Sequence, residues 1–124
     1  MLTQAVMLAM PGVPGIYYHS LIGSENDRAA AIESGINRRI NRAKLDADDV
    51  SRQLQDATTI RSKVATRYKR LLTVRQQEAA FDPFGDAEYD CQGPVFVIRR
   101  YCDSGNLWAV HNFSDAAVPV GGLP

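Results

Sequence analysis

The chain has 124 residues, of which 45% are apolar and 23% are charged, and its formal net charge is zero. This composition is typical of a globular protein with a modest core, and the charge balance gives no reason to expect nucleic acid or a membrane as a partner. No apolar run approaches the ~20 residues of a membrane-spanning helix, and the first residues match a signal peptide poorly. We therefore expect a cytoplasmic protein.

The first part of the chain contains two apolar segments. Residues 2–10 have apolar side chains at intervals of three and four, which predicts one face of a helix. A chain that opens inside a helix favours a piece of something larger. After a turn rich in proline and glycine, Ile16–Ile22 shows no polar alternation, which predicts a short strand covered on both faces. On this strand we favour a half-buried His19 with a backbone partner over a catalytic role for it.

A long polar segment, Gly23–Leu45, follows the predicted strand. Its middle, Arg28–Glu33, is long enough for one or two helical turns. Loops longer than about 12–15 residues without secondary structure are uncommon and are often functional. The segment is therefore the first candidate for a binding function, and the alternative is a disordered surface excursion.

Two helices are predicted next. Asp46 is a suitable N-cap, and Asp48 and Asp49 suit the positive end of the helix dipole. A second cap lies within Asp56–Thr59. An apolar stripe then predicts a long helix from Thr59 to about Glu78. The stripe consists of Ile60, Val64, Tyr68 and Leu71.

The long helix is strongly basic, with no acid between Ala57 and Gln77. Nucleic-acid binding is one interpretation of such a helix. We favour a solvated outer face, because the basic residues scatter around the helix, no stacking aromatics accompany them and the whole chain is neutral. No nucleic acid is therefore expected as a partner. The basic residues are Arg61, Lys63, Arg67, Lys69, Arg70 and Arg75.

The last part of the chain reads as antiparallel strands. Phe81–Gly85 breaks the long helix, and turns are predicted around Gly93 and over Asp103–Asn106. The expected strands are Glu88–Cys91, Val95–Cys102, Leu107–Phe113 and, less regular in pattern, Ala117–Val120. Trp108 lies alone on this hairpin, where it serves either core packing, which we favour, or sugar stacking.

The two cysteines, Cys91 and Cys102, are predicted on different strands at positions that do not oppose each other, with Cys91 beside Val95. Two free thiols are the expectation. Two cysteines and two distant histidines do not form a zinc site. The sequence thus predicts no metal site and no cofactor.

Three pieces of the sequence carry a family resemblance. Val13-Pro-Gly-Ile-Tyr-Tyr18, Gly23-Ser-Glu-Asn-Asp27 and Ile40-Asn-Arg42 together resemble the eighth strand and following loop of sucrose-phosphorylase-like enzymes, which belong to the α-amylase superfamily, glycoside hydrolase family 13. Asn112-Phe-Ser114 resembles a segment in the C-terminal β-domain of that superfamily. The resemblance covers nearly the whole chain.

The resemblance implies an α+β arrangement. Residues 1–80 would be the C-terminal end of a (β/α)8 barrel, with a helix tail, the last strand, the long loop and the last helix. Residues 81–124 would be a partial C-terminal antiparallel β-domain. A whole barrel needs ~250 residues, so the chain is expected to be a C-terminal piece. Tyr17 and Tyr18 would then pack inside the barrel.

Retaining glycosidic chemistry needs two carboxyl groups on either side of the scissile bond. In this superfamily they come from middle strands of the barrel, so the resemblance implies that this chain contains no catalytic residue and is inactive alone. It also implies that Arg42 helps line the glucosyl site, with Asn41 beside it. Arg38 is the second choice, because Ile-Asn-Arg also occurs at 36–38. A planar fork of donors suits this task.

The resemblance therefore implies a piece of a retaining α-glucoside phosphorylase, whose substrates would be an α-glucoside and phosphate. Two alternatives stay open. One is a stand-alone structural or interaction module without turnover, and the other is a piece of an amylase-type hydrolase or transglucosidase. In isolation the chain is expected to self-associate as a dimer or higher oligomer through Ile16–Ile22 and the long helix.

Overall fold

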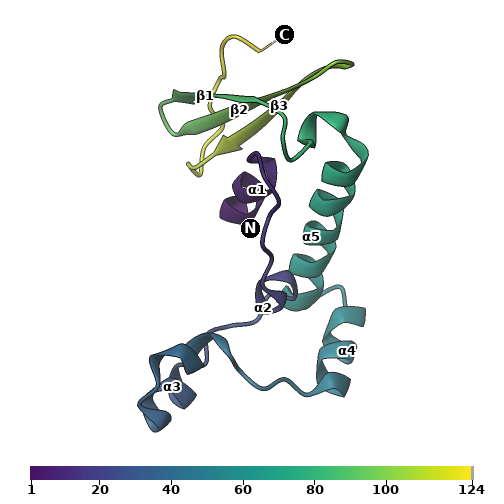
Figure 1. Cartoon of the computed structure of the whole chain (residues 1–124). Helices are drawn as coiled ribbons and strands as arrows, with labels where there is room; N and C mark the ends of the chain where they lie inside the picture. Colours follow the sequence, from purple (N-terminus) through teal and green to yellow (C-terminus); the bar gives the residue numbers. More distant parts are fainter. Residues whose placement is uncertain (124) are drawn as a thin grey trace. The chain divides into compact units, whose positions relative to one another are not determined.

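The computed structural model describes residues 1–123, which divide into two compact units. We call residues 1–14 with 70–123 the sheet unit, and residues 15–69 the loop unit. The long helix α5 (Ile60–Gln77) contributes residues to both (Figure 1). The boundary expected after residue 80 concerns a longer parent protein and stays a prediction.

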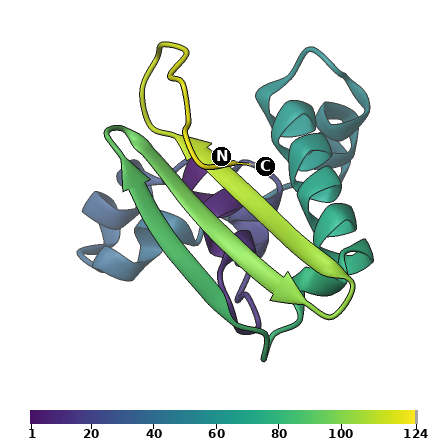
Figure 2. The same cartoon turned by 90° about the horizontal axis from the view of Figure 1, so that it is seen from above.

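The sheet unit contains a three-stranded antiparallel sheet in the order β1-β2-β3, and Figure 2 looks onto its neighbouring strands. The strands are β1 (Ala87–Gln92), β2 (Val95–Cys102) and β3 (Gly105–Asn112). Each pair is joined by a two-residue turn, and Gly93 in the first turn has φ 58°, a left-handed value that favours glycine. The three best strand predictions are confirmed.

The core of the sheet unit forms where α1 (Leu2–Ala9) and the short 3₁₀ helix η2 (Ala79–Phe81) meet the sheet. Ala9, Phe81 and Ile98 are buried together. The spacing of apolar residues in the first ten positions predicted this helix, and burying such side chains is worth about 1.5–3 kcal/mol each. Further apolar side chains pack around the three, namely Val6, Met10, Ala87, Phe96, Leu107 and Ala109.

A buried arginine on β2 ties this core together. Arg100 is 0% exposed, and its guanidinium donates to the carbonyls of Ala9 at 3.1 Å, Asp82 at 2.6 Å and Asp86 at 3.3 Å. These carbonyls belong to the end of α1 and to the loop before β1. The side chain thus fixes both segments to the sheet without an acidic partner among residues 1–123.

A second arginine completes the end of α1. Arg75 donates to the carbonyls of Leu8, Met10 and Gly12, the last at 2.6 Å. The last carbonyls of a helix have no partner inside the helix, so a cation there satisfies them and complements the dipole. Burial and then the charge of Arg100 lower the pKa of Arg75.

The loop unit is helical. It contains α2 (Tyr18–Leu21), α3 (Arg28–Ser34), the 3₁₀ helix η1 (Asn37–Asn41), α4 (Ala47–Gln55) and the first residues of α5. The predicted cap is confirmed, because Asp46 Oδ1 accepts from the amide of Asp49 at 2.8 Å. Thr59 Oγ1 accepts from the amide of Ser62 at 3.1 Å and begins α5. The long-helix prediction is confirmed.

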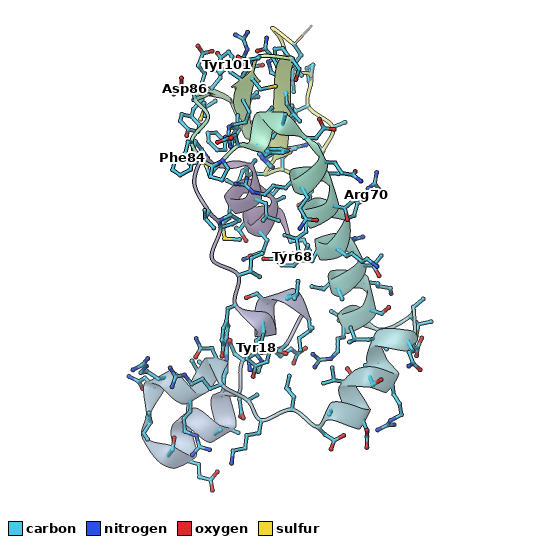
Figure 3. All side chains as sticks on the ribbon, turned by 45° about the vertical axis from the view of Figure 1, so that its right-hand side comes forward. Tyr18, Tyr68, Arg70, Phe84, Asp86 and Tyr101 are labelled. Carbon is cyan, nitrogen blue, oxygen red and sulfur yellow. The ribbon has the colours of Figure 1, made fainter. Side chains whose placement is uncertain are left out.

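The strand predicted over Ile16–Ile22 is wrong for this chain. Residues 15–17 have no regular secondary structure, Tyr17 is extended with φ −80° and ψ 130°, and α2 follows at once. A strand needs the backbone of a neighbour, and no strand of the described residues lies beside this one. Its amides bond locally instead, from Leu21 to the carbonyl of Tyr17 and from Ile22 to that of Tyr18. Tyr17 and Tyr18, expected inside the barrel, are 42% and 54% exposed. Figure 3 labels Tyr18.

Two smaller expectations near the sheet are also wrong. Ala117–Val120 forms no strand, since Pro119 lacks the amide hydrogen that a strand pairing needs. The chain is held there by two hydrogen bonds of 2.9 Å between the side-chain amide of Gln92 and the backbone of Gly121. Cys91 lies opposite Phe96 rather than beside Val95. Both cysteine thiols are free.

No helix within residues 1–123 is long and apolar enough to cross a membrane.

Candidate functional site

The predicted binding residues of the long loop line one cavity. It has a volume of about 210 Å³ and is bordered by Tyr17, Arg38, Asn41 and Arg42. The hydroxyl of Tyr17 donates to the backbone carbonyl of Asn41 at 2.7 Å. The structure therefore brings together all three residues that the sequence singled out, and adds a tyrosine.

The loop that carries these residues is closed at its base. The amide of Asp27 donates to the carbonyl of Ile40 at 2.7 Å. The carboxylate of Asp27 also accepts from the amide of Ala30 at 2.9 Å, which caps α3. Gly35, with φ 64°, ends this helix in a left-handed conformation that needs glycine. Helix, turn and η1 thus form one closed excursion.

The charged side chains that border the cavity are two arginines without an ion-pair partner among residues 1–123. Arg38 and Arg42 are exposed, and neither guanidinium has a hydrogen bond or ion pair with any of residues 1–123. Arg39, on the same 3₁₀ helix, is also exposed but does not border the cavity. Two free guanidinium groups suit oxyanions and sugar hydroxyls, because each presents several donors in a plane.

Four of the five aspartates of the loop unit accept hydrogen bonds away from the cavity. Asp27 and Asp46 cap helices, and Asp49 accepts from Arg52 and Gln53. Side-chain and backbone hydrogen bonds from Thr58 lower the pKa of Asp56. No carboxylate borders the cavity. Its lining is therefore suited to binding and has no group for general acid–base work on a glycoside.

Other candidate residues do not join this cavity. His19 is buried rather than half-buried as expected, and its Nε2 has no hydrogen-bond partner in the described part of the chain. Trp108 is half-buried on β3, with the Arg99 guanidinium 5.2 Å from its ring centre. Among residues 1–123 no group of three metal-binding side chains is placed to hold an ion.

Tyr17 is the member of the site that the sequence analysis missed as a binding residue, because it was assigned to packing. A tyrosine on an apolar stretch gives no sign of a partner 24 positions later. The signal that could have found it is its place in the Ile-Tyr-Tyr motif, which recurs together with Ile-Asn-Arg in the resemblance.

Several known proteins are similar in sequence to this chain. No family model matches the chain. It is 47% identical over 99 residues to a glucosylglycerate phosphorylase of Spirochaeta thermophila, an alignment that covers 79% of this chain and 17% of that protein. It is 41% identical over 106 residues to the glucosylglycerate phosphorylase of Escherichia coli K12, covering 85% of this chain and 19% of the relative.

A more distant relative is the sucrose phosphorylase of Streptococcus mutans, 26% identical over 106 residues, with 85% of this chain and 21% of the relative covered. The chain thus spans about a fifth of the length of the curated relatives it matches. It belongs, as a segment of that size, to the family of sucrose-phosphorylase-like proteins that includes the glucosylglycerate phosphorylases.

Proposed function

We propose that this chain is the C-terminal segment of a retaining α-glucoside phosphorylase, and that its loop contributes to the glucosyl-binding site. The substrates of the whole enzyme are an α-glucoside and phosphate. In this proposal residues 1–80 close a (β/α)8 barrel, residues 81–124 begin the β-domain, and the enzyme acts in the cytoplasm.

The observation that carries the proposal is the way the family-like motifs meet. Tyr17 reaches the carbonyl of Asn41 at 2.7 Å, and Asp27 reaches that of Ile40 at the same distance. The Ile-Tyr-Tyr, Asn-Asp and Ile-Asn-Arg pieces are therefore joined by direct hydrogen bonds in one compact unit. A loop held in this way presents its arginines with less conformational freedom than an open surface excursion, which favours a binding role.

Arg42 is the residue proposed to contact the glucosyl unit, with Asn41 and Arg38 beside it. Its guanidinium has no protein acceptor within residues 1–123, so its donors are available to sugar hydroxyls or to a carboxylate supplied by the rest of the barrel. Because the cavity has no carboxylate of its own, the catalytic acids belong to other parts of the enzyme. The isolated chain is then a binding element without turnover.

The test is phosphate-dependent release of glucose 1-phosphate from glucosylglycerate and, separately, from sucrose. The longer protein that contains this segment is expected to release glucose 1-phosphate only with phosphate present. The isolated chain, assayed at high concentration, is expected to release none. Release of free glucose at the same rate without phosphate would show that the enzyme is a hydrolase rather than a phosphorylase. Turnover by the isolated chain would contradict the proposal that the catalytic residues lie in other parts of the enzyme.

A further inference from the structure

The cavity beside Tyr17 is bordered by two arginines, one more than the single arginine proposed to bind the neutral glucosyl unit. Arg38 and Arg42 both border a space of about 210 Å³ in which no carboxylate balances them. Both side chains are exposed, so solvent screens their mutual repulsion and both guanidinium groups stay available to an occupant. An occupant with a negative charge gains charge-assisted hydrogen bonds from them, which a neutral occupant does not.

We propose that Arg38 binds an oxyanion of the second substrate and so determines which acceptor the enzyme accepts. The inference rests on the proposed function, and it assigns the carboxylate of a small hydroxy acid as that oxyanion. Arg42 serves the glucosyl unit, and Arg38 lies four positions earlier on η1, at the border of the same cavity. Sugar and acceptor carboxylate are thus bound side by side.

The chemistry of a guanidinium supports this division. Its planar fork of donors matches a carboxylate or phosphate with two parallel hydrogen bonds, which lysine does not reproduce. Arg38 has no acceptor among the described residues that would have to be displaced first. The Tyr17 hydrogen bond to Asn41, at 2.7 Å, holds the turn on which both arginines stand. The Arg38 guanidinium is therefore free to bind an oxyanion, and the backbone that carries it is held in place.

The relatives favour an acceptor with a carboxylate. Those at 47% and 41% identity are named for glucosylglycerate, which carries one, whereas the one named for sucrose, an uncharged sugar, is 26% identical. Inorganic phosphate is the other oxyanion that a phosphorylase handles. Both share the chemistry that Arg38 recognises, so the experiment needs an arm for each.

The experiment compares Arg38→Met with Arg39→Met in the longer enzyme. Arg39→Met removes the same charge from the same 3₁₀ helix at a position outside the cavity. Glucose 1-phosphate is the donor, and glycerate and its uncharged analogue glycerol are the acceptors. Arg38→Met is expected to lower the ratio of kcat/KM for glycerate to that for glycerol by about 10-fold or more. Arg39→Met is expected to leave the ratio within about 2-fold.

The experiment compares a ratio because partial unfolding of a variant lowers kcat/KM for glycerate and kcat/KM for glycerol alike. Arg38→Lys, which keeps the charge but not the fork, is expected to recover only part of the ratio. An unchanged ratio in Arg38→Met, or an equal fall in Arg39→Met, would overturn the proposal. A rise in KM for phosphate with an unchanged acceptor ratio would assign Arg38 to phosphate and overturn the carboxylate assignment.

Failure of the proposed function gives a different result. If the unaltered longer protein transfers glucose to no acceptor, the phosphorylase assignment falls. The arginine site is then tested by direct titration of the 124-residue chain with glycerate and with glycerol, following the arginine side-chain NMR signals. Saturable shifts of Arg38 with glycerate alone support the oxyanion site, and equal or absent responses to the two compounds contradict it.

Discussion

The phenolic hydroxyl of Tyr17 donates a hydrogen bond of 2.7 Å to the backbone carbonyl of Asn41, 24 positions further along the chain. This bond attaches the loop that carries the arginines to the segment before α2. Since the accepting group is a backbone carbonyl, the bond fixes the course of the turn rather than one side chain. The position of both Arg38 and Arg42 therefore depends on Tyr17.

Tyr17→Phe is expected to loosen this turn. Removing the hydroxyl leaves the Asn41 carbonyl without its protein donor, at a cost of about 0.5–1.5 kcal/mol. Amide hydrogen exchange of Asp27 and Arg42 should then accelerate by up to about 10-fold. The control is Tyr18→Phe, because the Tyr18 hydroxyl makes no hydrogen bond within residues 1–123. Equal exchange in both variants would contradict a positioning role for Tyr17.

Arg100→Met is expected to destabilise the sheet unit strongly. The change removes the guanidinium that donates to the carbonyls of Ala9, Asp82 and Asp86. The Asp82 carbonyl keeps the amide of Gly85 at 3.0 Å, but the buried bond to the Ala9 carbonyl has no replacement among the described residues. The expected loss in the free energy of unfolding is about 3–5 kcal/mol, measured by urea denaturation.

Arg99→Met is the matched control for this change. Arg99 is the preceding residue on β2, and its ion pair with Glu88, at 3.4 Å, lies at the surface. Such pairs contribute about 1 kcal/mol or less. Similar losses for the two variants would show that the buried carbonyl contacts of Arg100 do not stabilise the unit.

The sheet unit should also lose stability in mild acid. Burial lowers the pKa of His111 below its ordinary 6.5. As the pH falls through 6.5, the unfolded chain takes up a proton while the folded one stays neutral. The free energy of unfolding therefore decreases between pH 6.5 and the lower pKa of the folded state, by up to about 1.4 kcal/mol per pH unit.

Urea denaturation from pH 7.5 to 5.5 measures this dependence, with His111→Leu for comparison. Leucine suits the mostly apolar cavity around His111 and removes a buried ring nitrogen that has no partner among the described residues. The variant is expected to lose most of the slope in this range. A slope equal to that of the unaltered chain would assign the acid sensitivity to other groups.

The isolated chain is expected to self-associate. Within the loop unit only His19, Ser62 and Tyr68 are buried among the described residues, whereas Ile32 is 83% and Ile60 69% exposed. Sedimentation equilibrium at tens of micromolar should therefore show a dimer or higher oligomer, since burial of exposed apolar side chains favours association.

The interface is expected to include residues 16–22 and α5. Ile60→Lys, at the start of α5, should then weaken association. Phe84→Lys serves as the control, because Phe84 is 95% exposed but lies outside these segments (Figure 3). A clean monomer, or an equal effect of both substitutions, would contradict this interface.

Local patterns in the sequence were sufficient to predict α1, α4, α5 and the three strands of the sheet. The stripe of Ile60, Val64, Tyr68 and Leu71 depends only on helical spacing, and α5 follows it. The cap at Asp46 and the hairpin around Gly93 also depend on neighbouring residues. Such elements contain their own hydrogen bonds, so the sequence around them decides their structure.

The segment Ile16–Ile22 could not be predicted in this way. Its composition suits a strand, but a strand forms only where another strand offers its backbone. Likewise, the burial of Arg100 depends on carbonyls from Ala9 and Asp82, which lie far away in the sequence. An arginine in a strand pattern is normally expected at an exposed position, so its structural role could not be predicted from the sequence.

Arg38, Asn41 and Arg42 were predicted as site residues from motif order alone, and the structure places them around one cavity. The partner of this site, Tyr17, required the three-dimensional fold, because the contact joins residues that are not neighbours. Motif order thus identified which side chains to consider, and the hydrogen bonds showed what holds them.

The most direct test of the glucosyl-binding role is the kcat/KM for phosphorolysis of Arg42→Ala in the longer enzyme, with Arg39→Ala as the matched control. Loss of a charge-assisted contact made in the transition state should lower kcat/KM by about 2–4 kcal/mol for Arg42→Ala. Arg39 does not border the cavity, so its substitution should change kcat/KM by less than about 2-fold. An unchanged kcat/KM for Arg42→Ala would contradict the account and return this arginine to the solvated surface of the loop.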